Sequence, residues 1–412
     1  MSLIADLKSL EPSQRSAIWA SYLGWTLDAF DYFLLVFMLK AISTEFGTDV
    51  SQVAVAIMLT LAARPFGALV FGMLADRFGR RPILIVVILA FSVFSALSGL
   101  AGSLTQLLVI RTLFGFAMGG EWGIGASLVM ETVPARLRGP VSGLLQSGYP
   151  SGYFIASLAY FALFDTIGWR GMFMVGVAPA LFVIFIRMRV EESPVHEVHR
   201  ARSEGNILRP LGELARNWQV ALYLVLLMAA FNSLSHGTQD LYPTFLQKQH
   251  HFDTHTTGLL AIIGNVGAIV GGISFGILSE RIGRRRAIVL GALLVLPVIP
   301  LWAWAATPLL LALGAFLIQV AVQGAWGIVP VHLNELSPGR ARGTFPGFAY
   351  QLGNLAASWN VVFQTSIAES RHDDYGLALA IFAGGAAIAV AALSWLGPER
   401  RDVDFVEEAK RT

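Results

Sequence analysis

Seven ionisable side chains stand inside stretches that are otherwise apolar: Asp28, Asp31, Arg64, Arg111, Glu121, His236 and Asp240. A charged side chain at the centre of a bilayer costs about 2.5–3.5 kcal/mol on insertion scales, so such residues usually face a protein interior or a water-filled path. Carboxylates and an imidazole can carry protons there, and a guanidinium can bind an organic anion. We therefore expect these residues to line a pathway for a solute.

The segment GWTLDAFDYFLL places Asp28 and Asp31 three residues apart, so on a helix they share a face with Trp25 and Tyr32. Two carboxylates this close in a dry cavity cannot both ionise cheaply. We expect the pair to take up and release a proton. For either aspartate singly, the sequence is equally compatible with the neutralisation of a buried arginine such as Arg111.

Arg64, in LAARPFGALVFG, falls near the middle of an apolar stretch. A buried guanidinium is a planar donor that matches the two oxygens of a carboxylate. We expect Arg64 to contact a carboxylate substrate. The alternative is a permanent ion pair with Asp28 or Asp31.

A stripe of polar residues follows one face of the segment FNSLSHGTQDLYPTFL, at positions i, i+3, i+4, i+7 and i+8: Asn232, Ser235, His236, Gln239 and Asp240. In an apolar helix such a stripe must face the bundle interior or a water-filled path. His236 and Asp240, four residues apart, can form a hydrogen-bonded pair that exchanges protons near physiological pH. We expect the stripe to line a binding site.

The composition indicates which elements carry these residues. The chain has 412 residues, of which 55% are hydrophobic and 14% charged, and its mean hydropathy is +0.63, which excludes a soluble globular protein. Apolar stretches of about 20 residues, enough for a helix to cross a bilayer, recur along it. We predict an all-α membrane protein with spans near 17–39, 52–74, 82–101, 105–131, 139–162, 170–188, 218–247, 257–279, 286–304, 308–335, 343–368 and 374–396.

The long polar segment 189–217 divides these twelve spans into two sets of six. The predicted domains are therefore a bundle over 1–188, a cytoplasmic loop over 189–217, and a second bundle with a short tail over 218–412.

Basic residues predict the orientation. Of the 29 Lys and Arg residues, 23 fall on the side of the termini, and four fall on the other: Lys40, Arg170, Lys248 and Arg371. Because basic residues concentrate on the cytoplasmic face, we expect both termini to be cytoplasmic and the chain to lie in the plasma (inner) membrane. The segment from Met1 to Arg15 does not resemble a signal peptide.

The two halves repeat one another. GMLADRFGRR from Gly72 matches GILSERIGRR from Gly276 at an offset of 204 residues, METVPARLRG matches NELSPGRARG, and GEWG matches GAWG at the same offset. Parallel repeats build transporters with the substrate site between the halves. Glu121 aligns with the neutral Ala325, so the fold does not demand an acid there. We expect a second proton site at Glu121, with an internal ion pair to Arg111 or Arg64 as the alternative.

The repeated motif GMLADRFGRR resembles the loop signature of the major facilitator superfamily, and the resemblance extends over the whole chain. It implies two pseudo-symmetric six-helix bundles and a cytoplasmic salt-bridge cluster that holds the outward-facing state. On this sequence the cluster falls on Asp76, Arg77, Arg80, Glu131, Arg138, Glu280, Arg281, Glu335 and Arg342, with Glu131 and Arg138, and Glu335 and Arg342, as matching charges. The alternative is that the arginines only follow the positive-inside rule.

The stripe of the seventh predicted span resembles the signature N-x-x-[ST]-H-x-[ST]-Q-D-x-x-x-T of fungal lactate and pyruvate permeases of the Jen type, in the sialate:proton symporter branch. The matching positions are Asn232, Ser235, His236, Thr238, Gln239, Asp240 and Thr244. The resemblance implies that a monocarboxylate is bound by Arg64, Asn232, His236, Gln239, Asp240, Gln351 and Asn354. LDAFDYF and GGEWG are similar to bacterial sialic acid permeases.

Other chemistry is not indicated. No GKS or GKT phosphate loop is present, and the chain has no cysteine and a net charge of +2, so we expect no ATP hydrolysis, no thiolate metal site, no nucleic acid partner and no cofactor. The histidines of QKQHHFDTH are expected to belong to a solvated loop rather than to a metal site.

Together these patterns predict a secondary active transporter rather than an enzyme, monomeric in the bilayer, that takes up a small monocarboxylate such as lactate or pyruvate with a proton. Proton-coupled uptake of sialic acid or another organic acid is the nearest alternative. From other classes, an exporter is weakly suggested by GYPSG at 148–152, and a non-transporting sensor would need a signalling domain for which no segment is evident.

Overall fold

The computed structural model describes residues 9–202, 209–372 and 374–411, and every regular element within these ranges is a helix. Helices satisfy their own backbone hydrogen bonds, as lipid requires. Nine helical stretches in the described residues are long and apolar enough to cross a membrane, and one of them, Ala135–Ile184, covers two predicted spans. The remaining two spans lie in α2, which carries Asp28 and Asp31, and in α18 with α19. The predicted twelve-helix fold is confirmed.

The first bundle comprises α2 (Pro12–Phe46), α3 (Val50–Phe78), α4 (Arg80–Gly99), α5 (Leu104–Met118), α6 (Glu121–Thr132), α7 (Arg138–Gln146), α8 (Gly148–Val175) and α9 (Val177–Met188), with a short 3-10 helix, Ala135–Leu137, before α7. The fourth span is broken between α5 and α6 at Gly119 and Gly120. α8 turns back at Gly168, where φ is 62° and ψ is −178°, so it supplies parts of both the fifth and the sixth span.

The second bundle comprises α12 (Trp218–Gln239), α13 (Tyr242–Lys248), α14 (Thr254–Ile282), α15 (Arg284–Trp304), α16 (Pro308–Trp326), α17 (Val329–Leu336), α18 (Phe345–Ala357), α19 (Asn360–Ser370) and α20 (Tyr375–Leu396), with a 3-10 helix, Gly339–Ala341, before α18. The predicted loop over 189–217 contains two short helices, α10 (Pro194–Arg202) and α11 (Arg209–Arg216), and a further helix, α21 (Phe405–Arg411), follows α20.

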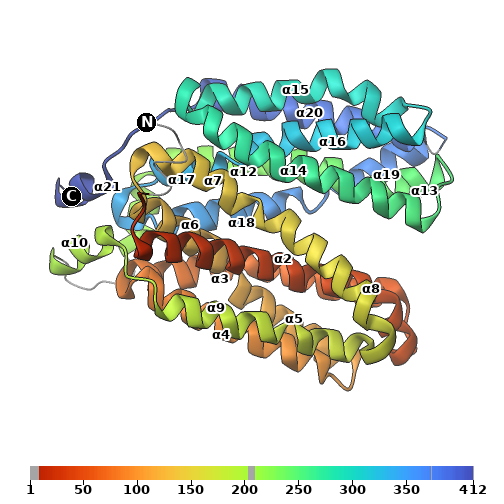
Figure 1. Cartoon of the computed structure of the whole chain (residues 1–412), viewed down its shortest axis with the longest axis horizontal. Coiled ribbons are helices and arrows are strands. Elements are labelled where there is room, and N and C mark those ends of the chain that lie inside the picture. Colours follow the sequence, from red (N-terminus) through yellow and green to blue (C-terminus); the bar gives the residue numbers. More distant parts are fainter. Residues whose placement is uncertain (1–8, 203–208, 373, 412) are drawn as a thin grey trace.

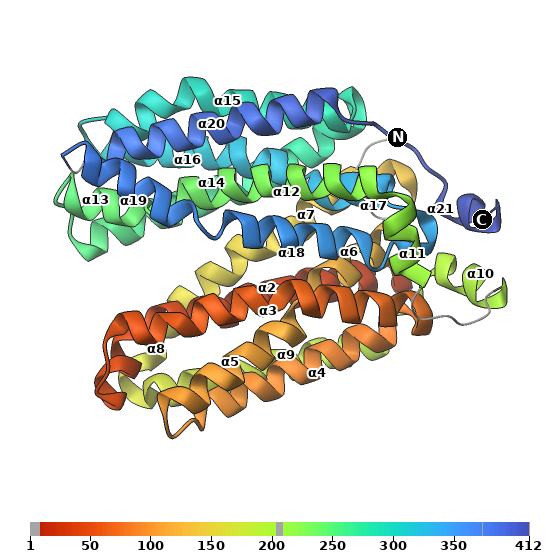
Figure 2. The same ribbon diagram turned by 180° about the vertical axis from the view of Figure 1, so that it is seen from behind.

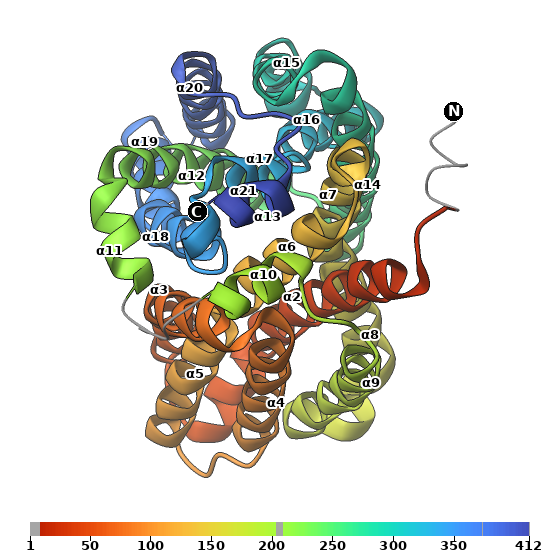
Figure 3. The same ribbon diagram turned by 90° about the vertical axis from the view of Figure 1, so that its left-hand side faces the viewer.

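Figure 1 and Figure 2 show the bundles side by side, with α7 packed on α14 and α3 packed on α18 across the boundary. α2 begins, and α20 ends, at the end of the molecule that carries α10 and α21, which we call the proximal end; the opposite end is the distal end. Seen from the proximal end, α21 lies between the two bundles (Figure 3).

Glycine permits two features that position the charged residues. Gly79 and Gly283 begin the tight turns at the proximal ends of α3 and α14 with φ of 104° and 94°, a region that side chains with a Cβ rarely adopt. A Cβ at Gly119 would lie 2.1 Å from the backbone oxygen of Arg64, so this glycine lets α3 and α5 pack closely.

Candidate functional site

A cavity of about 590 Å³ lies between the bundles. Its walls come from α2 and α8 on one side and from α12, α14 and α16 on the other, and it reaches Leu39, Ile57, Tyr242 and Leu260 near the distal ends of their helices. Cavities of this size and position are typical of binding sites for small molecules.

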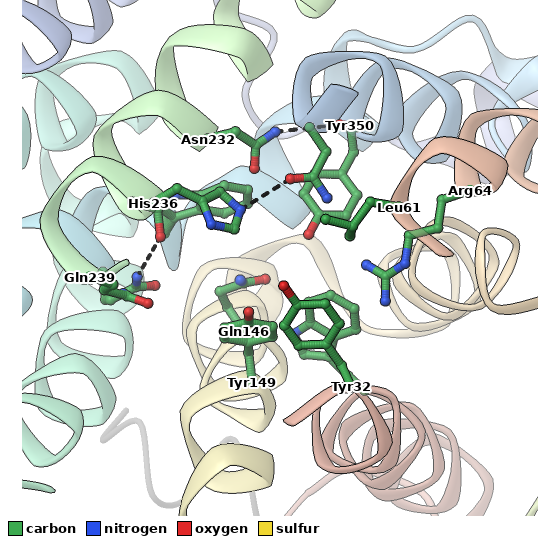
Figure 4. A pocket seen from close by; sticks show the side chains of 14 residues that line it. Tyr32, Leu61, Arg64, Gln146, Tyr149, Asn232, His236, Gln239 and Tyr350 are labelled. Atoms are coloured by element: carbon green, nitrogen blue, oxygen red, sulfur yellow. Dashed lines mark hydrogen bonds between the residues drawn. The ribbon is translucent and has the colours of Figure 1, made fainter. Parts of the chain in front are cut away.

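A smaller pocket of about 30 Å³ forms the floor of this cavity. The two share the lining residues Tyr32, Tyr149, His236 and Gln239, so they adjoin one another, and we call them together the central cleft. Figure 4 shows the floor with side chains from both bundles around it. Its other lining residues are Trp25, Leu61, Arg64, Gln146, Asn232, Ser235, Gln323, Trp326, Tyr350 and Asn354.

Most of the binding residues expected from the sequence are brought together here. Five of the seven line the floor: Arg64, Asn232, His236, Gln239 and Asn354. Asp240 lines the wider part of the cleft. Gln351 lines neither part: its side chain is buried, and its Oε1 has no hydrogen-bond partner among the described residues. The neighbouring Tyr350 faces the cleft instead, because one step along a helix turns the side chain by about 100°.

The guanidinium of Arg64 contacts other side chains of the first bundle, and Arg64 also lines the cleft. Its Nη2 lies 3.0 Å from Oδ2 of Asp28 and 2.7 Å from the sulfur of Met118. The ion pair that the sequence left as an alternative is therefore present, and Arg64 lines the floor of the cleft as well. Because a guanidinium has five N–H donors, one carboxylate does not exhaust it.

The two aspartates of α2 do not share one site. Asp31 accepts a hydrogen bond from Nη1 of Arg111 at 2.8 Å and another from Ser95, while the Arg111 guanidinium lies 3.9 Å from the ring centre of Phe114. Asp31 and Arg111 line neither part of the cleft. Each aspartate is thus paired with its own arginine, and only Asp28 is paired with one that reaches the cleft.

Glu121 has a partner that the sequence did not suggest. Its Oε1 lies 3.5 Å from Nη2 of Arg187, rather than beside Arg111 or Arg64, and both side chains are buried. In the described part of the chain, Oε2 of Glu121 and Nε of Arg187 have no hydrogen-bond partner. Arg187 was missed because it ends the sixth span and resembles the basic residues that flank a membrane.

The buried ion pairs within the membrane-spanning part, Arg64–Asp28, Arg111–Asp31 and Arg187–Glu121, belong to the first bundle. The repeat offset of 204 residues holds for whole helices, since α3 (Val50–Phe78) corresponds to α14 (Thr254–Ile282). At this offset the second bundle has neutral residues opposite the charged ones, namely Asn232 for Asp28, Ala268 for Arg64, Ala315 for Arg111 and Ala325 for Glu121. The first bundle therefore contributes charge to the cleft, and the second contributes neutral polar groups together with His236 and Asp240.

Hydrogen bonds fix the polar stripe of α12. His236 lies between Asp240, 3.3 Å from Nδ1, and the Oδ1 of Asn354, 3.1 Å from Nε2. Gln239 donates to Gln319 at 3.0 Å, and Gln323 donates to Ser235 at 3.0 Å. The two glutamines of α16 were missed, although their spacing of four in an apolar helix is a usable signal.

The acids and arginines at the proximal end form two matching clusters. Arg80 lies 3.0 Å from Asp76 and 3.2 Å from Glu131. In the second bundle Arg284 lies 2.8 Å from Glu280 and 3.2 Å from Glu335. The glutamates thus pair with Arg80 and Arg284, while Arg138 and Arg342, expected as their matching charges, each interact electrostatically with the glutamate of the other bundle. Arg284 was missed although it repeats Arg80.

Each cluster also reaches the other bundle. Asp76 accepts hydrogen bonds from the backbone N–H of Gly343 at 2.8 Å and from the hydroxyl of Thr344 at 2.7 Å, immediately before α18. Glu280 accepts one from the N–H of Gly139 at 2.6 Å, in the first turn of α7. Carboxylates are favourable at helix N-termini. These contacts hold the proximal ends together, while the cleft widens toward the distal end.

Arg138 and Arg342 make direct side-chain contacts with the C-terminal tail. Their guanidinium carbons lie 3.7 Å and 3.8 Å from the ring centre of Phe405, which is 1% exposed. Arg342 also pairs with Glu408 at 2.6 Å, and Arg138 donates to the backbone oxygen of Val403. Planar guanidinium groups stack well on aromatic rings.

The two remaining expected members of this cluster, Arg77 and Arg281, are exposed at the surface.

Comparison with known proteins agrees with this geometry. The family model described as Major Facilitator Superfamily matches residues 21–361. The chain is 33% identical to a probable 4-methylmuconolactone transporter of Cupriavidus pinatubonensis, over 87% of this chain and 85% of that one. It is 27% identical to a carboxylic acid transporter protein homolog of Saccharomyces cerevisiae, over 96% of this chain and 70% of that one. It is also 27% identical to the sialic acid transporter NanX of Escherichia coli, over 91% of each chain.

Among solved structures, the chain resembles that of a proton:xylose symporter bound to 6-bromo-6-deoxy-D-glucose. The TM-score is 0.80 at 20% identity, and 96% of this chain and 98% of that chain are covered. This likeness concerns the fold alone.

Proposed function

Since the chain belongs to the Major Facilitator Superfamily, whose members among its relatives are transporters and not enzymes, we propose that it is a symporter that carries a small monocarboxylate, lactate or pyruvate, together with a proton. The observation that carries this proposal is the position of Arg64, which pairs with Asp28 at 3.0 Å and at the same time lines the floor of the cleft.

Coupling follows from the cost of unpaired charge. With Asp28 ionised, the Arg64–Asp28 pair is neutral. When a proton neutralises Asp28, Arg64 loses its counter-ion and can bind the substrate carboxylate, which again gives a neutral site. A buried charge without a partner costs several kcal/mol. The protein with only the substrate bound has one negative charge too many, and the protein with only the proton bound leaves Arg64 unpaired, so both states are disfavoured. Of the three acids expected to couple protons, we assign Asp28, because Asp31 and Glu121 have arginines that line neither part of the cleft.

The second bundle supplies the groups for the rest of the substrate. We assign recognition of the 2-hydroxyl or keto oxygen to Asn232, His236, Gln239 and Asn354, which line the floor opposite Arg64. Asp240 holds the imidazole of His236 from the wider part of the cleft. Gln351 is not included, because its side chain does not reach the cleft.

In this account the chain is a monomer of the plasma (inner) membrane, with its proximal end and both termini in the cytoplasm. The domains over 1–188 and 218–412 rock about the cleft, and the segment 189–217 connects them on the cytoplasmic side. The closed proximal end and the widened distal end correspond to the outward-facing state.

A larger organic acid is the second candidate. The volume of about 590 Å³ exceeds what a three-carbon acid requires. Two relatives are named as transporters of 4-methylmuconolactone and of sialic acid. In this case the carboxylate occupies the floor and the rest of the molecule extends into the wider part of the cleft.

Uptake of labelled L-lactate into proteoliposomes with an acidic outer solution tests the proposal. Arg64→Lys should abolish uptake although the charge is kept, because an ammonium lacks the bidentate geometry. Arg371→Lys, at an exposed distal position, is the matched control. Normal uptake affinity in Arg64→Lys would contradict the assignment, and competition by pyruvate, acetate and sialic acid would rank the substrates.

A further inference from the structure

We propose that three tyrosines, Tyr32, Tyr149 and Tyr350, bind the substrate carboxylate together with Arg64 through their phenol hydroxyls. They come from α2, α8 and α18, so the set spans both bundles. All three line the floor of the cleft, and Figure 4 shows Tyr32 and Tyr350 on the side of the floor that carries Arg64, with Tyr149 beside Gln146. This inference rests on the proposed carriage of a carboxylate.

The phenol hydroxyls of these tyrosines have no partner in the described part of the chain, where no residue makes a hydrogen bond to the phenol oxygen of Tyr32, Tyr149 or Tyr350. Elsewhere in the bundles, Tyr22 donates to Ser151 at 2.8 Å and Tyr242 donates to the backbone oxygen of Leu311 at 3.4 Å. Tyr350 is buried and Tyr32 and Tyr149 are half-buried, and all three line the floor of the cleft. Three phenol hydroxyls that lack a partner among the described residues and line one pocket are free to donate to a ligand there.

The positive charge of Arg64 faces the same space as the phenols. Arg64 interacts electrostatically with all three phenols, and the four side chains line one floor. A carboxylate has about four lone-pair sites, and an arginine fork satisfies two, so the three phenols share the other two as neutral donors. A lysine in their place would add a positive charge and remove the neutrality on which the coupling depends.

Aromatic packing fixes the rings of two of these tyrosines. The ring of Tyr350 lies 4.6 Å from that of Trp122 and 5.7 Å from that of Trp326. The ring of Tyr149 lies 5.5 Å from that of Trp25 and 5.5 Å from that of Phe33. Rings packed in this way hold their hydroxyls in place before the substrate arrives, which lowers the entropy cost of binding.

The arrangement also defines what the carboxylate does in the transport cycle. Tyr32, Tyr149 and Arg64 belong to the first bundle and Tyr350 to the second. A carboxylate bound by all four groups connects the bundles at the floor of the cleft. Substrate binding is thereby linked to the movement of one bundle against the other.

Tyr32→Phe, Tyr149→Phe and Tyr350→Phe test the proposal, with Tyr160→Phe as the matched control, because Tyr160 is a half-buried tyrosine of α8 that lines neither part of the cleft. Each of the three should raise KM for L-lactate about 10- to 100-fold, the increase expected when one hydrogen bond to a charged group is lost. Tyr160→Phe should leave KM unchanged. The Tm of the ligand-free protein should be unchanged in all four variants.

Competition separates a role at the carboxylate from a general role in packing. Wild type should prefer lactate over its neutral amide, lactamide, and the three variants should lose most of this preference. Unchanged KM in all three, or an equal loss of affinity for both competitors, would overturn the role of the tyrosines while leaving the carrier intact. Failure of the wild type to take up or bind any carboxylate would instead overturn the proposed function.

Discussion

Asp76→Asn tests how the proximal end is held closed. Asp76 accepts two hydrogen bonds from the other bundle, at 2.8 Å from Gly343 and 2.7 Å from Thr344, and it lies 3.0 Å from Arg80. Asparagine keeps one acceptor oxygen but loses the charge and the second acceptor. A hydrogen bond to a charged group contributes about 1.5–3 kcal/mol. Loss of about 2 kcal/mol shifts the equilibrium toward the inward-facing state about 30-fold.

The absence of cysteine from the chain makes this shift measurable. A single reporter, Val36→Cys, places a thiol in the wall of the cleft, where Val36 is 36% exposed. A membrane-impermeant maleimide added outside should label it more slowly when Asp76→Asn is present. Arg80 keeps its contact with Glu131 at 3.2 Å, so the first bundle should remain folded.

Two further variants make the comparison specific. Asp165→Asn removes an exposed acid near the distal end and should leave the labelling rate unchanged. Glu280→Gln, in the matching cluster of the second bundle, should slow labelling in the same direction as Asp76→Asn. Labelling of Val36→Cys at the wild-type rate in both cluster variants would refute the role of these carboxylates.

Three other predictions concern single residues. Asp28→Asn should keep exchange of lactate across the membrane but abolish its response to a pH gradient, measured by counterflow; a retained response would assign the proton elsewhere. Phe405→Ala removes two guanidinium–ring contacts, each of about 0.5–2 kcal/mol, and should slow labelling of the same cysteine; an unchanged rate would show that the tail does not hold the bundles together. Gly79→Ala places a Cβ at φ 104° and 2.2 Å from Glu192, so Tm should fall by several degrees, whereas Gly258→Ala, with open space around it, should not lower Tm; equal Tm values would contradict the steric reasoning.

The fold could be predicted because lipid leaves few choices. Apolar length identifies the spans, and the repeat at an offset of 204 residues identifies the two halves. The sequence also pointed to Arg64 and the stripe on α12, which line the cleft, because a polar residue in an apolar membrane helix usually faces the protein interior. Their role in binding stays a prediction.

The partners of these residues could not be predicted in the same way. These partners depend on how separate helices pack. The packing decides which acid pairs with Arg187, and it places Phe405 between Arg138 and Arg342. Gln351 was expected in the cleft and Tyr350 was not, since the rotation of a short helix such as α18 is set by its neighbours. Tyrosine is common in membrane helices, so its type alone does not mark a binding residue.

The central claim is that one proton accompanies each carboxylate, because Arg64 exchanges Asp28 for the substrate. The most direct test is uptake of labelled L-lactate into proteoliposomes under two separate gradients, an acidic outer pH and an imposed membrane potential. Accumulation driven by the pH gradient and unaffected by the potential is the predicted result. Accumulation that ignores the pH gradient, or that follows the potential, would contradict it.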